Sequence, residues 1–492
     1  MAVVESASEP KQNETRHWRA KYHYAPERNW MNDPNGLVYF EGEYHLFYQY
    51  NPFGADWGHM SWGHAVSPDL VNWTELPVAL PEAGFMVFSG SAVVDWQNSS
   101  GLGNGLEPPL IALFTAHDGA RCNQSQHLAF SHDRGRSWAH YSGNPVIDIG
   151  EADFRDPKVF WHAPSQHWVM VVALAQAHKL LIYSSPNLID WTQQSEFGPL
   201  GATGGQWECP DLIELPVEGE DGEAAWILKI DVDKDLIGKG SGGQYFIGHF
   251  DGRSFTPESE CARIVDFGAD FYASASWSDL PETQAAPVWI GWTSNHTSGR
   301  AYPTFPWRGE MSVPRQLSFR RGRDGLGLIQ RPISALIDHF ELLHLAREVD
   351  LGPGACSQLD LESANNAFQV SFQLPAASAP LHLNLTASAG GRIGIFVDAA
   401  HGRAGVDRTQ AEIPTHPDFQ SSNEGEFEAG RPVDVRLLVD ATMMELFVDD
   451  GACVLTERFF LSGGLKLELA CNSPVQIQRL CVERFRPAVA AT

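Results

Sequence analysis

Short runs of aromatic and β-branched residues, broken by Gly, Asp, Asn and Pro, fill the chain up to about residue 330. Leu37–Phe40 and Tyr44–Tyr50 flank a segment, 41–43, with glycine at its centre, and this arrangement predicts a β-hairpin. Helical periodicity is nearly absent from this part, so we expect it to be all-β. The further strands predicted here are Val159–Trp161, Trp168–Ala173, Ala225–Val232, Gln244–His249 and Val288–Thr293.

A weak internal repeat divides this all-β part. Related turn-like segments end in the aromatic residues Trp73, Trp138, Trp191 and Phe255, which lie about 60 residues apart. A period of roughly this length fits a four-stranded propeller blade with long loops, and residues 25–325 would then hold about five blades. The alternative is similar turn chemistry in a β-sandwich. We expect the repeated tryptophans to pack between blades and not to bind ligand.

The pattern changes after Pro332. Apolar residues at helical spacing from Ile333 to Leu343 predict a linker helix within 331–347. Strand-like alternation then returns and predicts a β-sandwich over 348–488. The whole chain is therefore expected to be all-β, with an N-terminal extension (1–21), a five-bladed β-propeller (22–330), the linker helix and a C-terminal sandwich. Its predicted strands are Phe368–Leu374, Leu381–Leu385, Ile393–Val397, Val435–Val439, Glu445–Val448 and Ala452–Leu455.

The composition of the chain limits the classes of molecule that it is expected to bind. The chain has 492 residues, of which 43% are hydrophobic, and no apolar run long enough to span a membrane. Its formal net charge of −27 would repel nucleic acid and anionic membrane surfaces, so neither is an expected partner. A neutral ligand is a more favourable partner for a chain of this charge than an anionic one.

The cysteines and the N-terminal segment say little about function or location. The seven cysteines are scattered without a C-x-x-C pair, which disfavours a zinc site or a disulfide framework. The segment Met1–Glu14 is polar and is not an intact signal peptide. A secreted mature form is our expectation for the location, and a cytoplasmic protein is the alternative.

Three acidic residues stand in aromatic or proline-bounded segments. Asp33 lies in the block Trp30–Gly36, Asp156 precedes Pro157, and Glu208 lies between a tryptophan and a cysteine. Alone, the motif of Asp33 is typical of a turn and that of Asp156 of a surface ion pair with Arg155. Their separations correspond to about two blades and then one, and equivalent strands of propeller blades converge on the central channel. We therefore expect the three carboxyl groups to meet at one end of the channel.

Such a set matches the needs of a retaining glycosidase, in which an ionised carboxylate attacks the anomeric carbon and a carboxylic acid protonates the leaving oxygen. Apolar surroundings raise the pKa of a carboxyl group, and the flanking tryptophan and cysteine predict this effect at Glu208. Glu208 is thus the predicted proton donor.

The full motif set resembles glycoside hydrolase family 32, the family of invertases, inulinases, levanases and related fructosyltransferases. The resemblance covers roughly residues 22–488. It is carried by Trp30–Gly36, Arg155-Asp156-Pro157, Glu208-Cys209-Pro210-Asp211, Gln49-Tyr50-Asn51-Pro52, Trp57-Gly58, Trp62-Gly63-His64-Ala65, Phe88-Ser89-Gly90-Ser91, Pro306-Trp307-Arg308-Gly309 and Glu445-Leu446-Phe447-Val448 with Asp450-Gly451.

This resemblance implies a five-bladed propeller with an appended β-sandwich and no metal or other cofactor. It implies that Asp33 is the nucleophile, Glu208 the general acid and base, and Asp156 a stabiliser of the transition state. Cys209 would be a buried thiol and not a nucleophile. The implied substrates are fructans, fructo-oligosaccharides or sucrose. The residues implied to hold the terminal fructose are Asn32, Gln49, Trp57, Phe88, Ser89, Arg155 and Trp307.

The acceptor half of the reaction stays open. Many family hydrolases carry Gly-Trp-Met followed by Asn-Trp, whereas this chain has Gly291–His296, which we expect near the pocket rim. An exo-acting fructan hydrolase is the first hypothesis, and a levan fructotransferase that releases a difructose anhydride is the second. Two further hypotheses are a binding module that has lost activity and an inverting propeller glycosidase. The preference between β-2,6 and β-2,1 linkages and a homodimeric state are also open.

Overall fold

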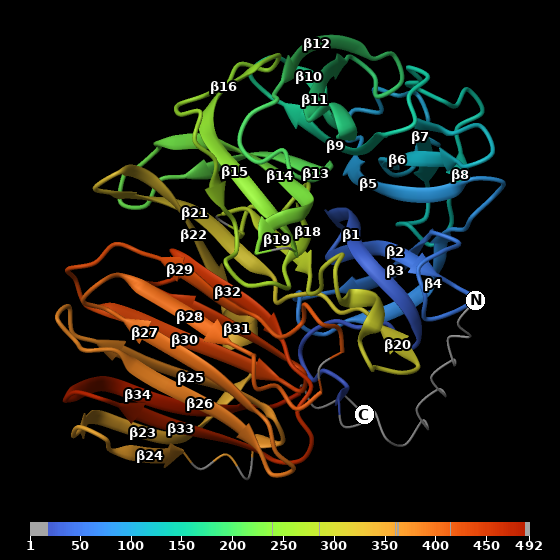
Figure 1. Cartoon of the computed structure of the whole chain (residues 1–492). Helices are drawn as coiled ribbons and strands as arrows, with labels where there is room; N and C mark the ends of the chain where they lie inside the picture. Colours follow the sequence, from blue (N-terminus) through green and yellow to red (C-terminus); the bar gives the residue numbers. More distant parts are fainter. Residues whose placement is uncertain are drawn as a thin grey trace.

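The structure is a computed structural model that describes residues 18–487 except 239, 285, 360, 362, 363 and 414. It is almost entirely β, and its first part consists of five sheets that follow one another along the chain (Figure 1). The first sheet contains β1 (Asn29–Phe40), β2 (Glu43–Asn51), β3 (Ser61–Ser67) and β4 (Thr74–Leu80), with β20 (Trp307–Arg308) beside β1. The second contains β5 (Met86–Val94), β6 (Leu110–Asp118), β7 (Asn123–Ser131) and β8 (Ala139–His140).

The other three sheets repeat this order. The third contains β9 (Phe154–His162), β10 (His167–Leu174), β11 (Lys179–Ser185) and β12 (Thr192–Phe197). The fourth contains β13 (Trp207–Pro216), β14 (Ala224–Ile237), β15 (Gly240–Phe250), β16 (Phe255–Pro257) and β17 (Arg263–Ile264). The fifth contains β18 (Tyr272–Ser276), β19 (Val288–Trp292), β21 (Arg315–Gly322) and β22 (Gly325–Pro332). Two short 3-10 turns are η2 (Ala175–Ala177) and η3 (Gly299–Ala301).

The first strands of the five sheets form a closed ring. Each of β1, β5, β9 and β13 contacts the first strand of the next sheet, and β18 contacts β1 again. The parallel pairing of β20 with β1 joins the last blade to the first. The predicted five-bladed propeller is therefore confirmed, and Figure 1 shows its blades around the centre formed by these strands.

The four copies of the sequence repeat lie at the same place in the first four blades, between the third and fourth strands. In the first copy, the Asp69 carboxylate accepts the backbone N–H groups two and three residues later, at 2.9 and 2.7 Å, and thereby fixes the turn. The aromatic residue at the end then reaches a neighbouring blade. Trp73 stacks on Trp277 of the fifth blade, and Trp138 packs edge-on against Phe47 of the first. Both tryptophans are half-buried and pack between blades against the core, as predicted.

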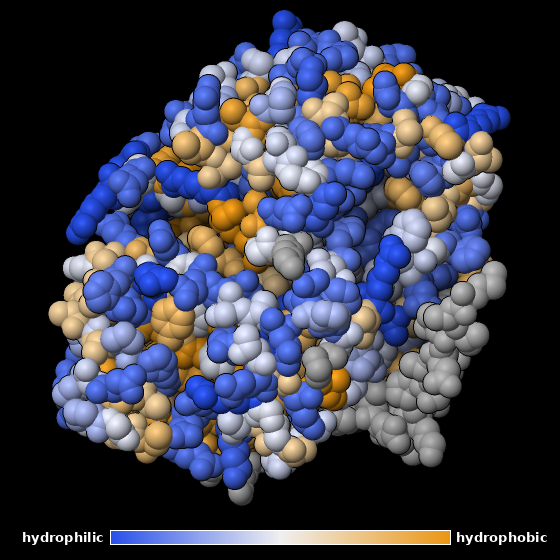
Figure 2. Space-filling view, viewed as in Figure 1, coloured by the Kyte–Doolittle hydropathy of each residue, from blue (hydrophilic) through white to orange (hydrophobic). Residues whose placement is uncertain are grey.

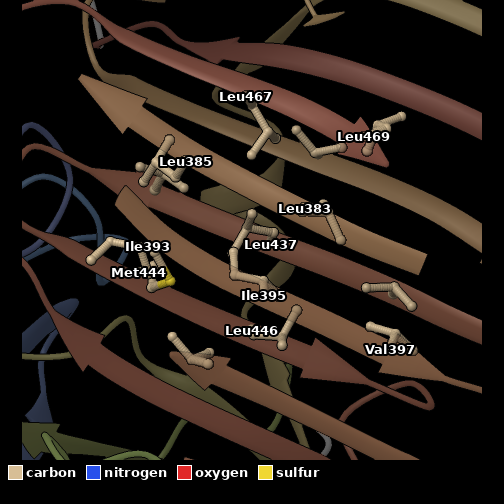
Figure 3. Packing of buried hydrophobic residues seen from close by; sticks show 14 of the residues in the cluster. Leu383, Leu385, Ile393, Ile395, Val397, Leu437, Met444, Leu446, Leu467 and Leu469 are labelled. Atoms are coloured by element: carbon tan, nitrogen blue, oxygen red, sulfur yellow. The ribbon is translucent and has the colours of Figure 1, made fainter. Parts of the chain in front are cut away.

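The second part is a sandwich of two six-stranded sheets. One sheet has the order β23 (Phe340–Leu351), β34 (Val475–Phe485), β25 (Ala367–Leu374), β30 (Val433–Asp440), β31 (Met443–Val448) and β32 (Cys453–Arg458). The other has the order β24 (Cys356–Leu359), β33 (Leu465–Cys471), β26 (Leu381–Ala387), β27 (Arg392–Asp398), β28 (Arg403–Asp407) and β29 (Ser422–Glu426). Alternate apolar side chains of both sheets meet in its core (Figure 3).

The predicted linker helix over 331–347 is wrong for most of its length. Only α1 (Ser334–Ile337) is helical, and the chain from Phe340 onward forms the edge strand β23, which pairs with β34 along its length. The apolar residues that suggest a helix also suit an edge strand, and pairing with β34 satisfies the backbone. Tertiary context therefore overrides the local pattern.

The face of the molecule shown in Figure 2 is mostly polar. Figure 2 shows hydrophilic residues over most of the visible face, with smaller apolar areas between them. Within the described part of the chain, no helix is long and apolar enough to cross a membrane.

Buried ion pairs cross the interface between the two domains. Arg315 of the propeller donates to Glu445 of the sandwich at 2.5 Å, and both side chains are fully buried. His23, which precedes the first blade, lies between Asp440 and Glu445 at 3.0 and 2.9 Å. Burial alone would lower the pKa of His23, but the hydrogen bonds and charges of the two carboxylates raise it to about 9.

The raised pKa of His23 predicts that the folded protein loses stability at alkaline pH. Because the pKa of His23 is higher in the folded than in the unfolded state, its stabilisation is complete below pH ~6.5 and disappears as pH rises through about 9. The difference amounts to at most about 3 kcal/mol. Thermal melting of the wild type should therefore show a lower Tm from pH 6.5 to 9, with a weaker slope in His23→Gln. Parallel slopes in the two proteins would contradict this.

Candidate active site

A cavity of about 150 Å³ opens among the inner strands of the propeller. Asp33 enters it from β1, Asp156 from β9 and Glu208 from β13, so the three acidic residues predicted to meet do so. Its lining consists of Trp30, Asn32, Asp33, Gln49, Trp57, Phe88, Ser89, Arg155, Asp156, Glu208, Trp292, Asn295, His296 and Arg300.

Backbone irregularities turn these side chains toward the cavity. The pairing of β1 with β2 shifts between Met31 and Pro34, and that of β13 with β14 shifts between Glu208 and Asp211. Asp156 adopts a left-handed φ of 67°, which is unusual for a residue other than glycine. Shifts of this kind re-aim side chains that a regular pleat would point elsewhere.

Asp33 is held by donors on both carboxylate oxygens. Ser89 Oγ donates to Oδ2 at 2.6 Å, and Asn32 Nδ2 donates to Oδ1 at 2.9 Å. Trp30 Nε1 in turn donates to the Asn32 side-chain oxygen at 2.7 Å. These contacts fix the orientation of the Asp33 carboxylate and leave its outer lone pairs for a ligand in the cavity.

Glu208 forms an ion pair with Arg155. Arg155 Nε and Nη2 donate to Oε1 at 3.1 and 2.9 Å, and the Tyr272 hydroxyl donates to Oε2 at 2.6 Å. His296 Nε2 lies 3.6 Å from Oε2. Burial raises the pKa of Glu208, but Arg155, His296 and Tyr272 outweigh burial and lower it below its usual value. The predicted rise of this pKa in apolar surroundings is therefore wrong, because a guanidinium occupies the site.

Asp156 shows the opposite shift. Burial, together with the charges of Glu208 and Asp33, raises the pKa of Asp156 to about 7 against the effect of Arg155. Its Oδ2 accepts the backbone N–H of Cys209 at 3.0 Å. Of Asp156 and Glu208, Asp156 is therefore the carboxyl group whose neutral form the surroundings favour. Burial also raises the pKa of the Cys209 thiol, so this residue does not present a thiolate.

Six of the seven residues expected to hold the sugar line the cavity. These six are Asn32, Gln49, Trp57, Phe88, Ser89 and Arg155. Trp307 does not. It is 1% exposed, its Nε1 donates to Glu310 at 3.0 Å, and the Arg19 guanidinium lies 3.8 Å from its ring. Pairing of β20 with β1 places Trp307 in the wall behind the cavity, which corrects the expectation.

The predicted set lacks several lining residues. Trp292, Asn295 and His296 belong to the segment expected near the pocket rim, and they line the cavity. Arg300 gives no sequence signal, although its guanidinium lies 5.6 Å from the Trp57 ring across the mouth of the cavity. Tyr272 likewise gives none, since its contact with Glu208 joins residues far apart in sequence.

The site also bears on metal binding. Over residues 18–487, outside the six gaps, no three His, Cys, Asp or Glu side chains are placed to hold a metal ion. The cavity offers acid–base and nucleophilic chemistry from carboxyl groups that lie beside the guanidinium of Arg155.

Comparisons with known proteins agree with this geometry. Residues 23–332 match the model of the glycosyl hydrolases family 32 N-terminal domain, and residues 345–480 match that of the family 32 C terminal. The chain is 40% identical to a levanase of Bacillus subtilis, over 96% of this chain and 71% of that protein. It is 37% identical to an extracellular exo-inulinase of Aspergillus awamori, over 90% of each.

Solved structures give the same result. The crystal structure of exo-inulinase from Aspergillus awamori superposes with a TM-score of 0.88, at 34% identity, and covers 95% of this chain and 98% of that one. A β-fructofuranosidase from Schwanniomyces occidentalis complexed with fructosyl-erythritol also has a TM-score of 0.88, at 31% identity, with 95% and 97% coverage. The chain, with its propeller, its sandwich and its three converging acids, therefore belongs to glycoside hydrolase family 32 and acts on fructosides.

Proposed function

We propose that this protein is a retaining, exo-acting β-fructosidase that releases terminal fructose from fructans, fructo-oligosaccharides or sucrose. The observation that carries the proposal is the meeting of Asp33, Asp156 and Glu208 in one small cavity. The names of its relatives, a levanase and an exo-inulinase, support fructan as the substrate class. Extracellular relatives also support a secreted location. We further propose residues 22–330 as the catalytic unit and 348–488 as the sandwich unit.

The first half of the reaction breaks the bond between C2 of fructose and the leaving oxygen. Asp33, oriented by Ser89 and Asn32, attacks C2 and forms a fructosyl ester. Glu208 gives a proton to the leaving oxygen, so the departing sugar leaves as a neutral alcohol.

This step needs a proton on Glu208, whereas in the free protein Asp156 holds it more readily. Hydroxyl groups of a bound fructose would donate hydrogen bonds to the Asp156 carboxylate and favour its ionised form. The resulting charge beside Glu208 would raise the pKa of Glu208. Substrate binding thus moves the proton preference from Asp156 toward the residue that needs it.

The second half transfers the fructosyl group to an acceptor. Water attacks C2, Glu208 takes its proton, and Asp33 is released, which gives fructose with retained configuration. A fructotransferase is the second candidate, because His296 and Arg300 form a polar rim where an acceptor sugar would approach. In that case a fructose hydroxyl replaces water and a difructose anhydride is formed.

Product analysis tests both candidates. The purified protein is incubated separately with sucrose, inulin and levan, and the products are separated and weighed by mass spectrometry. Free fructose as the main product supports the hydrolase, and a dehydrated disaccharide supports the fructotransferase. Added methanol should give the stable methyl β-fructofuranoside, whereas the α-anomer would contradict a retaining mechanism.

Arg155→Gln tests the electrostatic control of Glu208. Because the charge of Arg155 is the largest influence that lowers the pKa of Glu208, its loss should raise that pKa and move the basic limb of the kcat/KM profile to higher pH. We also expect kcat/KM at the optimum to fall about 100-fold, since a charged hydrogen bond at the acid is lost. Arg155→Lys, which keeps the charge, should shift the limb less. An unshifted limb in Arg155→Gln would contradict the assignment.

A further inference from the structure

We propose that two arginines of the sandwich, Arg408 and Arg458, are positioning residues of the active site. They act through Asp270 and Glu310 of the propeller on the segment 293–302, which brings three polar residues to the mouth of the cavity. This inference uses the proposed function for its kinetic readout.

The first connection runs through Asp270. Arg408 Nη1 donates to its Oδ2 at 2.5 Å, and the backbone N–H of Arg458 donates to the same oxygen at 2.9 Å. On the other side, Asn295 Nδ2 donates to Oδ1 at 2.8 Å. Asp270 is fully buried and Arg408 is 1% exposed, so the charge of Asp270 needs Arg408 for compensation, and Arg408 also pairs with the buried Glu457 at 3.0 Å. The carboxylate of Asp270 thus connects Asn295, which lines the cavity, to Arg408 of the sandwich.

The second connection runs through Glu310. Arg458 Nη1 donates to its Oε2 at 2.7 Å, and Trp307 Nε1 donates to its Oε1 at 3.0 Å. The backbone oxygen of Glu310 accepts the N–H and the hydroxyl of Thr293, each at 2.9 Å. The start of the segment is therefore fixed by a residue whose carboxylate is paired with the sandwich.

Internal contacts make the segment a rigid unit. Asn295 Oδ1 accepts the N–H of Ser298 at 2.7 Å, and its backbone oxygen accepts the N–H of Gly299, where η3 begins, at 3.1 Å. The Tyr302 hydroxyl at the far end donates to Asp270, the same carboxylate that binds Asn295. The guanidinium of Arg458 lies 5.4 Å from the Tyr302 ring. Movement of the anchor would therefore move the whole segment.

The segment brings side chains next to the predicted proton donor and to Trp57. It places His296 Nε2 3.6 Å from Glu208 Oε2 and the Arg300 guanidinium 5.6 Å from the Trp57 ring. The three acidic residues lie on the inner strands, but only Glu208 has a side chain of this segment beside its carboxyl group. Since a displacement of about 1 Å at a catalytic site can cost about 100-fold in rate, loosening the anchor should impair the proton donor while leaving the orientation of Asp33 by Ser89 and Asn32 intact.

The test compares two buried aspartates at the same interface. In Asp270→Asn, an NH2 group replaces one acceptor oxygen, so the side chain cannot serve both Arg408 and Asn295. The matched control is Asp266→Asn. Asp266 accepts from Arg315 Nη1 at 2.9 Å and from the backbone N–H of Thr456 at 2.9 Å, which are partners outside the segment.

We expect both variants to lower Tm by similar amounts. Only Asp270→Asn should lower kcat/KM for sucrose and levan, by about tenfold or more, and change the ratio of the two rates. Arg408→Gln should act in the same direction, since it removes the hydrogen bond from Arg408 to Asp270. We expect this variant to fold, because Glu457, whose pKa burial raises to about 7, can become neutral when the arginine is lost. Arg408→Lys should restore part of the activity.

Wild-type kinetics in folded Asp270→Asn, or equal kinetic losses in Asp266→Asn, would overturn the inference. If Asp270→Asn does not fold, Arg408→Gln decides: folded protein with wild-type kinetics rejects the role of the sandwich. A wild type that releases no product from sucrose, inulin or levan would instead reject the proposed function, so the two failures are distinguishable.

Discussion

Replacement of Asp33 by asparagine is expected to lower kcat for sucrose by at least ~10,000-fold, because an amide cannot form the fructosyl ester on which the proposed mechanism depends. Asparagine has nearly the same shape, and its oxygen can still accept a hydrogen bond from Ser89 or from Asn32. The fold and the affinity for fructose should therefore change little. Initial rates and thermal melting of the two proteins, measured side by side, check this expectation.

Asp279→Asn supplies the matched control for this experiment. Asp279 is also an acidic residue of the propeller, but it accepts from the backbone N–H of Val94 and from Trp96 Nε1 at the far end of β5. Its replacement should leave kcat near the wild-type value. If Asp33→Asn kept more than about a hundredth of the wild-type kcat, the nucleophile would have to be another residue.

Replacement of Glu208 by glutamine should produce a loss that depends on the leaving group. Departure of a sugar needs a proton, so kcat/KM for sucrose should fall by about 1,000-fold or more. Fluoride leaves without a proton, so β-fructosyl fluoride should lose less than about tenfold in the formation of the fructosyl-enzyme. The measurement is the ratio of kcat/KM values for the two substrates in both proteins.

The two substrates serve as controls for each other, because a damaged fold would reduce both rates. Equal losses for sucrose and the fluoride would assign Glu208 a binding role and not proton transfer. The basic limb of the pH profile should also disappear for the variant, since glutamine does not titrate.

The sequence is informative where function depends on repeated local patterns. Asp33, Asp156 and Glu208 lie at related places in three blades, so the repeat alone predicts that their side chains meet. Strand alternation likewise predicts both domains. The pKa of Glu208 could not be predicted in this way, because the decisive neighbour, Arg155, is 53 residues away and its reach depends on the folded chain.

Further residues are hidden for the same reason. Tyr272 contacts Glu208 only through the meeting of separate strands, and Trp307 lies in the wall because β20 pairs in parallel with β1. The apolar spacing from Ile333 to Leu343 predicts a helix, yet the chain from Phe340 onward is a strand because it pairs with β34. Local patterns specify elements well, whereas long-range pairing specifies which faces they present.

The buried ion pairs between the domains restrict how this protein can be divided. A truncation after the last blade would leave Asp266, Asp270 and Glu310 without the sandwich groups that bind them. The cut would also expose the apolar residues of a core cluster that the propeller shares with the sandwich, so the propeller would lose both its ion pairs across the interface and this buried apolar surface. The propeller and the sandwich should therefore melt in a single cooperative transition. A chimera that borrows the propeller must also borrow the sandwich strands that carry its counter-charges, so the smallest unit that can be exchanged is the two-domain chain.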